Sequence, residues 1–168
     1  VAAPFSYAVA SFTRNKTTGA LTQLAGTDGC VKEVGDGVEC ADGKALDGAN
    51  DVAVSPDGKH VYVTSSILGS GGVAAFARNK TTGALTQLAG TDGCVSETGS
   101  GGDCADGVAV NNACSVAVSP DGKHLYVASC MSDAVAIFTR NKTTGALTQL
   151  AGTDGCVSET GTGGDCAD

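Results

Sequence analysis

Hydrophobic and polar residues alternate in short runs along this chain, and no run shows the period of a helix. Alternation predicts β-strands, because successive side chains of a strand point to opposite faces. The clearest runs occupy 51–66 and 115–130, and each contains a Pro-Asp-Gly turn, so both predict β-hairpins. Further strands are expected at 20–26, 84–90 and 146–152, each after an Asn-Lys-Thr-Thr-Gly turn.

One string, RNKTTGALTQLAGTDGC, occurs three times without change, at 14–30, 78–94 and 140–156. A fixed period of this size indicates an array of supersecondary units. A strand centred on Phe12 is expected ahead of the first copy. The segment that follows, from 27 to about 49, is rich in Gly, Asp and Cys, lacks periodicity and predicts a loop.

The cysteines of the second hairpin suggest its register. If Cys114 lies opposite Cys130, then Val118 faces Tyr126 and both faces of the hairpin are apolar. A sheet that is apolar on both faces is sandwiched between neighbours. Four-stranded antiparallel units repeated in this way are the blades of a β-propeller. The expected fold class is therefore all-β, a β-propeller-type array of about two and a half blades.

Three units divide this array. Residues 1–50 form half a blade and a loop, while 51–113 and 114–168 each form a blade with its loop. Without an initiator Met or a signal-peptide pattern, the chain is expected to begin after processing or to be a window of a longer chain.

The eight cysteines compensate for a core with few large aromatic residues. Three pairs are each ten residues apart, too far for the short spacing of zinc sites, and no His lies nearby. Disulfides are expected instead, which implies an oxidising compartment and secretion to the extracellular space. The expected bridges are Cys30–Cys40, Cys94–Cys104, Cys156–Cys166 and the cross-strand Cys114–Cys130.

The chain's charge and sequence motifs narrow the classes of partner that it is expected to bind. A net charge of −8 argues against nucleic acid, and no apolar stretch reaches the roughly 18 residues needed to span a bilayer. Asn15, Asn79 and Asn141 begin N-glycosylation sequons on expected turns, so glycans are possible partners. Asn is also simply a good turn residue, and the repeat alone would triplicate it.

The two histidines and the acidic loops are weak candidates for chemistry. His60 and His124 follow the Asp-Gly-Lys turns and are expected to be solvated. Calcium is conceivable at the acidic loops, although their spacing matches no defined calcium loop. The first loop carries Asp28, Glu33, Asp36, Glu39, Asp42 and Asp47.

Charge is distributed unevenly if the turns alternate between two faces. One face would carry eight basic residues against Asp57 and Asp121, and the other sixteen acids against Lys32 and Lys44. Complementary faces steer association, and head-to-tail contacts propagate as filaments when they do not close. Near-identical surfaces also suit polymeric contacts. Self-association into a homo-oligomer or filament is therefore expected.

The residues VAVSPDGKHVYV, followed by VAAFARNKTTGALTQL, resemble the YVTN-type repeat of the lactonase-like β-propellers. The loop TDGCVSETGTGGDCADG is similar to Cys-bracketed loops of secreted bacterial members. The resemblance implies a secreted or periplasmic propeller, and some members hydrolyse sugar lactones. No residue of this chain can be assigned a catalytic, cofactor-binding or metal-binding role from it.

Taken together, these features favour an extracellular structural or interaction repeat protein, a scaffold or filament subunit without chemistry of its own. One alternative is a fragment of a secreted lactonase-like hydrolase. A second alternative is a carbohydrate- or calcium-binding module.

Overall fold

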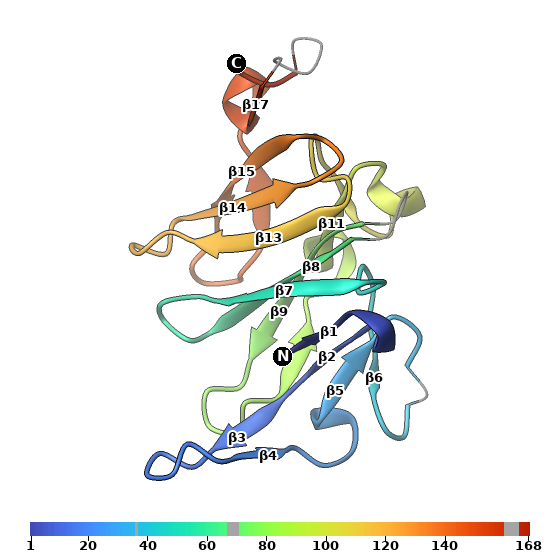
Figure 1. The fold of residues 1–168 in the computed structure, drawn as a ribbon, viewed down its shortest axis with the longest axis vertical. Coiled ribbons are helices and arrows are strands. Elements are labelled where there is room, and N and C mark those ends of the chain that lie inside the picture. Colours follow the sequence, from blue (N-terminus) through green and yellow to red (C-terminus); the bar gives the residue numbers. More distant parts are fainter. Residues whose placement is uncertain (36, 67–70, 160–164) are drawn as a thin grey trace.

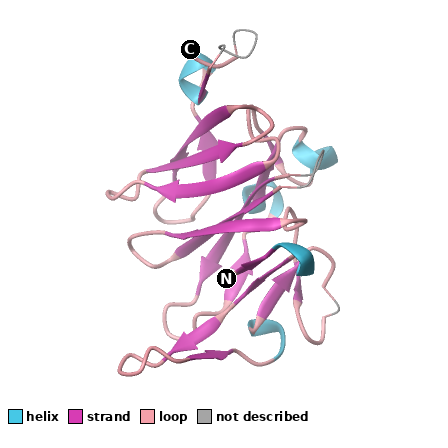
Figure 2. Cartoon of the chain, in the orientation of Figure 1, coloured by secondary structure: helices cyan, strands magenta, loops and turns pink. Residues whose placement is uncertain are grey.

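The computed structural model describes residues 1–35, 37–66, 71–159 and 165–168, and in it three β-sheets stack along the long axis of the molecule (Figure 1). Strands dominate the described residues, and the helices among them are single 3-10 turns (Figure 2). None of these helices is long or apolar enough to cross a membrane.

The first sheet has the order β1-β2-β5-β6, and a ribbon of β3 and β4 continues from it. Its strands are β1 (Ala2–Ala3), β2 (Ala8–Ala10), β5 (Cys30–Lys32) and β6 (Ala41–Asp42), with β3 (Phe12–Arg14) and β4 (Leu21–Gln23) in the ribbon. Here β2 and β3 together occupy the place of the single strand expected around Phe12.

The second and third sheets are complete blades, in which β8 and β9, and β14 and β15, are inner strands. The second sheet contains β7 (Ala49–Val54), β8 (His60–Ser65), β9 (Gly72–Arg78), β10 (Leu85–Gln87), β11 (Cys94–Ser96) and β12 (Ala105–Asp106). The third contains β13 (Ala113–Val118), β14 (His124–Ser129), β15 (Ala134–Arg140), β16 (Leu147–Gln149) and β17 (Cys156–Ser158). The expected all-β, propeller-type fold is confirmed.

The outer strand of each blade is split, which the sequence did not predict. One half of β9 pairs with β10, and the other half pairs with β11, inside the segment expected to be a loop. Three-residue strands are too short to show a period. The 3-10 helices are η1 (Pro4–Ser6), η2 (Gly26–Asp28), η3 (Gly90–Gly93), η4 (Gly99–Gly102) and η5 (Gly152–Gly155).

Backbone geometry explains why the GTDGC part of the string does not vary. Gly90 opens η3 with a φ of 59°, a left-handed conformation that other residues rarely adopt. A side chain on Gly93 would collide with the carbonyl oxygen of Leu88. Both glycines are therefore required where the outer strand crosses from β10 to β11.

The register expected for the second hairpin is wrong by one residue. Val118 pairs with Leu125, and Val116 pairs with Val127, while Cys114 lies at a bulge between Ala113 and Ser115 and not directly opposite Cys130. A bulge adds one residue to one strand, so residues beyond it shift relative to the partner.

Two apolar cores lie between the sheets. Val9 and Val31 of the first sheet pack with Val63 and Phe76 of the second. The other face of the second sheet packs on the third, where Leu125 and Phe138 are fully buried. All six residues of β8 are buried, so the second sheet is packed on both faces. Packing on both faces is expected for the hairpin of 115–130, but no described residue covers the far face of the third sheet, where Tyr126 is 38% and Val135 39% exposed.

Candidate functional site

A buried arginine at the end of β15 joins the third sheet to the second. The side chain of Arg140 is fully buried, and its Nη2 lies 3.2 Å from each carboxylate oxygen of Asp57. Its Nε donates to Tyr62 Oη at 2.9 Å, and its Nη1 donates to the carbonyl of Gly122 at 2.8 Å. We call Asp57, His60, Tyr62 and Arg140 the Arg140 network.

Tyr62 and His60 reach this network from β8, where side chains two residues apart share a face. Tyr62 Oη donates to the carbonyl of Gly145 at 2.8 Å. His60 Nδ1 lies 2.6 Å from Arg140 Nη2 and therefore accepts a hydrogen bond. Its Nε2 is then the protonated nitrogen, and the backbone of Thr144 is its partner.

Burial and neighbouring charges shift the pKa values of His60, Tyr62 and Asp57. Burial lowers the pKa of His60, and the positive charge of Arg140 lowers it further. Burial raises the pKa of Tyr62, although Arg140 opposes this shift. Partial burial disfavours ionised Asp57, but hydrogen bonds from its own turn and from Arg140 outweigh it and hold the pKa of Asp57 well below its usual range. At neutral pH one carboxylate therefore balances one guanidinium.

The Arg140 network is a joint between blades and not an open catalytic site. Perturbed pKa values can mark catalytic groups when those groups line a cleft. A general base must also come within hydrogen-bond distance of the substrate's proton. Here His60, Tyr62 and Arg140 are buried, and they bond to one another and to backbone carbonyls. The network holds the two sheets together.

A second joint connects β7 to β13. Asp51 Oδ2 accepts hydrogen bonds from Ser115 Oγ at 2.8 Å and from the Val116 N–H at 3.0 Å. Partial burial opposes ionisation of Asp51, but these bonds, with one from the Val52 N–H, lower its pKa. Asp51 therefore stays ionised at neutral pH, and it links the first strands of the two blades.

A third joint holds the segment that connects one blade to the next. The Val108 N–H donates to Gln149 Oε1 at 2.8 Å, and Gln149 Nε2 donates back to the Val108 carbonyl at 2.8 Å. The Val110 N–H donates to Glu97 Oε2 at 2.7 Å. Matching contacts one unit earlier join Lys44 to Gln87 and Leu46 to Glu33. Repeated residues thus make repeated joints.

The sequons lie on turns of these blades, whereas one cysteine of each pair (Cys30, Cys94, Cys114 and Cys156) lies in a strand. The structure pairs Cys30–Cys40, Cys94–Cys104, Cys114–Cys130 and Cys156–Cys166 as disulfides. Asn15, Asn79 and Asn141 are exposed, and each side-chain oxygen accepts two backbone N–H groups of its own turn. Glycosylation at these asparagines stays a prediction.

The expectation that both histidines are solvated is wrong for His60, which is 4% exposed. The third sheet covers it, and sequence position alone does not show that cover. His124 occupies the same place in the third sheet and is partly exposed.

The acidic loops use several of their carboxylates internally. Asp42 accepts the Gly35 N–H at 2.9 Å, and Asp103 pairs with Lys44 at 2.6 Å. Asp36 lies outside the described residues. Within the described residues, no three His, Cys, Asp or Glu side chains gather as metal ligands.

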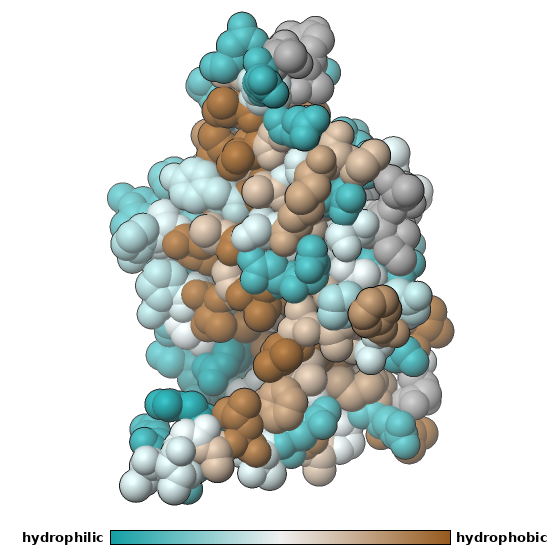
Figure 3. Space-filling model, in the orientation of Figure 1, coloured by the Kyte–Doolittle hydropathy of each residue, from teal (hydrophilic) through white to brown (hydrophobic). Residues whose placement is uncertain are grey.

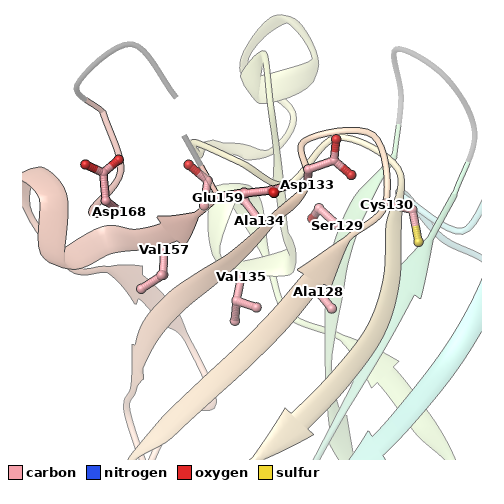
Figure 4. Close-up of a pocket in the computed structure, with 10 residues that line it drawn as sticks. Ala128, Ser129, Cys130, Asp133, Ala134, Val135, Val157, Glu159 and Asp168 are labelled. Carbon is pink, nitrogen blue, oxygen red and sulfur yellow. The ribbon is translucent and has the colours of Figure 1, made fainter. Parts of the chain in front are cut away.

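A shallow pocket lies on the far face of the third sheet (Figure 4). Its base is apolar, with Val135 and Val157, and carboxylates of Asp133, Glu159 and Asp168 stand at its rim. Figure 3 shows hydrophobic surface just below the C-terminal segment. Its apolar walls, Val135 and Val157, are the counterparts of Val73 and Val95, which are buried between the second and third sheets.

Stacked antiparallel blades of this kind define a β-propeller architecture. Residues 107–158 match the family model described as Lactonase, 7-bladed beta-propeller. The expected resemblance to the lactonase-like propellers is therefore confirmed. No curated protein matches the chain significantly.

Solved structures show the same likeness. A protein provisionally assigned as a 6-phosphogluconolactonase from Bacteroides fragilis is 25% identical over 92% of this chain, with a TM-score of 0.60. A counterpart with the same provisional assignment from Bacteroides uniformis is 26% identical over 88% of the chain, with a TM-score of 0.59. The chain covers 34% of each of these two structures.

A periplasmic gluconolactonase from Pseudomonas aeruginosa shares the fold, at 23% identity over 97% of this chain and 36% of its own length, with a TM-score of 0.58. The chain thus spans about a third of the length of the structures it resembles.

These comparisons correct the expected function. The interpretation as a structural repeat, a scaffold or filament subunit, is wrong, because the lactonase match and the phosphogluconolactonase neighbours favour the hydrolase alternative. Each blade repeats the residues that join it to the next blade.

Proposed function

We propose that this chain is part of a β-propeller hydrolase that acts on sugar lactones. The observation that carries the proposal is the match of residues 107–158 to the lactonase propeller family. The likeness to proteins provisionally assigned as 6-phosphogluconolactonases supports a gluconolactone or its 6-phosphate as substrate. The four disulfides support a location in an oxidising compartment outside the cytoplasm.

The reaction adds water to an ester within a ring. A water oxygen attacks the lactone carbonyl, the bond from that carbon to the ring oxygen breaks, and a hydroxy acid results. Catalysis needs a base that takes a proton from the water and donors that stabilise the developing oxyanion. Asp57, His60, Tyr62 and Arg140 are committed to a joint between blades, so we assign these two roles to none of them.

The test measures proton release from glucono-1,5-lactone and its 6-phosphate in a pH-stat. It compares this chain, the natural polypeptide that contains it and a protein-free control for spontaneous ring opening. We expect hydrolysis by the natural polypeptide at least tenfold above the spontaneous rate. A folded natural polypeptide that releases protons no faster than buffer on either lactone would refute the proposal.

A further inference from the structure

Four lysines gather where the turns of two neighbouring blades touch. Lys59 and Lys123 occupy the same place in the Pro-Asp-Gly turns of the second and third sheets. Lys80 and Lys142 occupy the same place in the Asn-Lys-Thr-Thr-Gly turns of those two sheets. All four side chains belong to exposed residues. We call these four residues the lysine cluster.

Within each blade, the second lysine lies against the turn that carries the first. A Cβ placed on Gly58 would lie 3.9 Å from Cε of Lys80, so Lys80 packs beside the turn of Lys59. In the third sheet, Nζ of Lys142 donates to the carbonyl of Asp121 at 3.1 Å. Each blade therefore brings a pair of lysines to the tip of its first hairpin.

The two Pro-Asp-Gly turns also touch each other, which joins the two pairs. A Cβ placed on Gly122 would lie 3.6 Å from Cδ of Pro56. In Figure 1 the turns between β7 and β8 and between β13 and β14 lie next to each other at the left of the molecule. The ammonium groups of both blades thus share one surface.

Carboxylates cancel little of this positive charge. Asp57 belongs to the first of the two turns, but the buried guanidinium of Arg140 binds it. Asp121 is exposed, and its Oδ2 lies 3.9 Å from Nζ of Lys123. Among the described residues, no carboxylate forms an ion pair with the other three lysines. The cluster therefore keeps an excess of positive charge, although the whole chain is negative.

The acids of the disulfide loop lie at the far end of the strands. Glu97 and Asp103 belong to the loop that follows β11, whereas the lysines stand at the opposite end of β8 and β9 (Figure 1). A strand of six residues is about 20 Å long. Charges are screened over about 8 Å at physiological ionic strength. A large anion at the turns is therefore attracted by the lysines more than it is repelled by that loop.

The chemistry of the turns favours a polysaccharide among the possible polyanions. Their tips consist of Pro, Asp, Gly, Lys, Asn and Thr, without an aromatic or large aliphatic side chain. Single-stranded nucleic acids bind by stacking on aromatic rings, and membrane surfaces take up apolar side chains. The turns instead expose threonine hydroxyls and the Nδ2 groups of Asn79 and Asn141, whose Oδ1 atoms are bonded within the turns. Hydroxyls and amides form hydrogen bonds with sugar hydroxyls.

We propose that the lysine cluster binds an anionic polysaccharide, whose acidic groups meet lysines of two neighbouring blades at the same time. One exposed lysine contributes little to such binding. Two pairs on one surface bind a polymer multivalently, and the gain in affinity comes from holding several of its charges at once. This binding is independent of lactone hydrolysis, because the cluster uses none of the groups that the reaction would require.

The test measures binding of the chain to polygalacturonate by biolayer interferometry. The control polymer is the methyl ester of polygalacturonate, which has the same sugar without the negative charge. We expect binding to the charged polymer alone. Its affinity should fall at least about tenfold between 50 and 200 mM NaCl, because binding to the lysines releases counterions.

Two double variants with the same change in net charge separate the cluster from overall charge. The double variant Lys59→Gln/Lys80→Gln should weaken binding at least about fivefold, because it removes one pair. The double variant Lys16→Gln/Lys32→Gln should weaken it less than about twofold. Lys16 lies in an identical turn of the first sheet, and Lys32 lies in β5. Circular dichroism checks that both variants are folded.

Three outcomes would overturn the inference. Absence of binding to polygalacturonate at 50 mM NaCl would refute it directly. Equal losses in the two double variants would reduce the effect to overall charge. Tighter binding to duplex DNA or to phosphatidylglycerol vesicles than to polygalacturonate would assign the lysines to a different class of partner.

Discussion

Tyr62 and Tyr126 occupy the same place in two nearly identical hairpins, SPDGKHVYV and SPDGKHLYV. Tyr62 is fully buried and bonds to Arg140 and Gly145 of the third sheet. Tyr126 is 38% exposed, because none of the described strands packs against it. The burial of a repeated residue is therefore set by the blade that packs against it. A repeat therefore needs a neighbour to gain its full stability.

The largest expected effect comes from removing the arginine of the joint. Arg140→Ala leaves the Asp57 carboxylate and the carbonyl of Gly122 without their partner, so the free energy of unfolding should fall by about 3–5 kcal/mol. The matched control is Arg78→Ala, since Arg78 donates to the carbonyl of Gly58 in the same way. Its cost should be about 1 kcal/mol. Urea denaturation measures both, and equal losses would show that the Arg140 network adds nothing.

The next effect concerns the disulfide across the hairpin of the third sheet. Cys114–Cys130 spans the third sheet's hairpin, while the corresponding places in the second sheet are Asn50 and Ser66. Replacing both cysteines by serine should lower the free energy of unfolding by about 3 kcal/mol through the entropy of the unfolded chain. Thermal unfolding followed by circular dichroism measures it. A loss under about 1 kcal/mol would mean that the bridge does not support this blade.

A smaller effect should separate the two tyrosines directly. Tyr62→Phe removes a buried hydroxyl that accepts from Arg140 and donates to Gly145, at a cost of about 1–3 kcal/mol. Tyr126→Phe removes a hydroxyl from a partly exposed ring and should change stability by less than about 0.5 kcal/mol. Urea denaturation of the two variants measures both losses in the free energy of unfolding. A loss for Tyr126→Phe as large as that for Tyr62→Phe would show that the two hydroxyls contribute equally despite their different burial.

The smallest effect is a dependence of stability on pH. His60 has a lowered pKa in the folded protein, so the unfolded chain binds its proton first as pH falls below about 6.5. The free energy of unfolding should therefore decrease on acidification from that pH, by at most about 1.4 kcal/mol per unit from this group. The lowered pKa of Asp57 acts in the same direction at more acidic pH.

Histidine variants isolate that contribution. His60→Gln should flatten the decline between about pH 7 and 5. His124→Gln, at the same place in the third sheet, is the matched control. Chemical denaturation at each pH gives the slope. If both variants keep the decline of the original chain, His60 is not its source.

Much of the fold could be predicted from particular residues. The Pro-Asp-Gly turns located both hairpins, and the Asn-Lys-Thr-Thr-Gly turns located the outer strands β4, β10 and β16. The regular cysteine spacing indicated the loop bridges. The split of the outer strand escaped prediction, because three residues such as Cys94–Ser96 carry no period. The bulge beside Cys114 escaped for a similar reason, since one inserted residue leaves the alternation of its neighbours intact.

The candidate joints were less predictable than the fold. Arg140, Gln149 and Glu97 belong to or follow the repeated string, and the sequence marked them only as repeated. Their roles depend on partners 78, 41 and 13 residues away. Such pairings become visible only when the sheets are stacked.

Local sequence is sufficient to predict the strands, the turns, the spacing of the loop bridges and the resemblance to lactonase-like propellers. These properties depend on local backbone preferences and on alternation, which a single segment contains in full. Only the tertiary structure decided that His60 is buried and His124 is not, and that Tyr62 holds an arginine while Tyr126 faces solvent. Two identical strings specify the same strand, but burial depends on the sheet that packs against it.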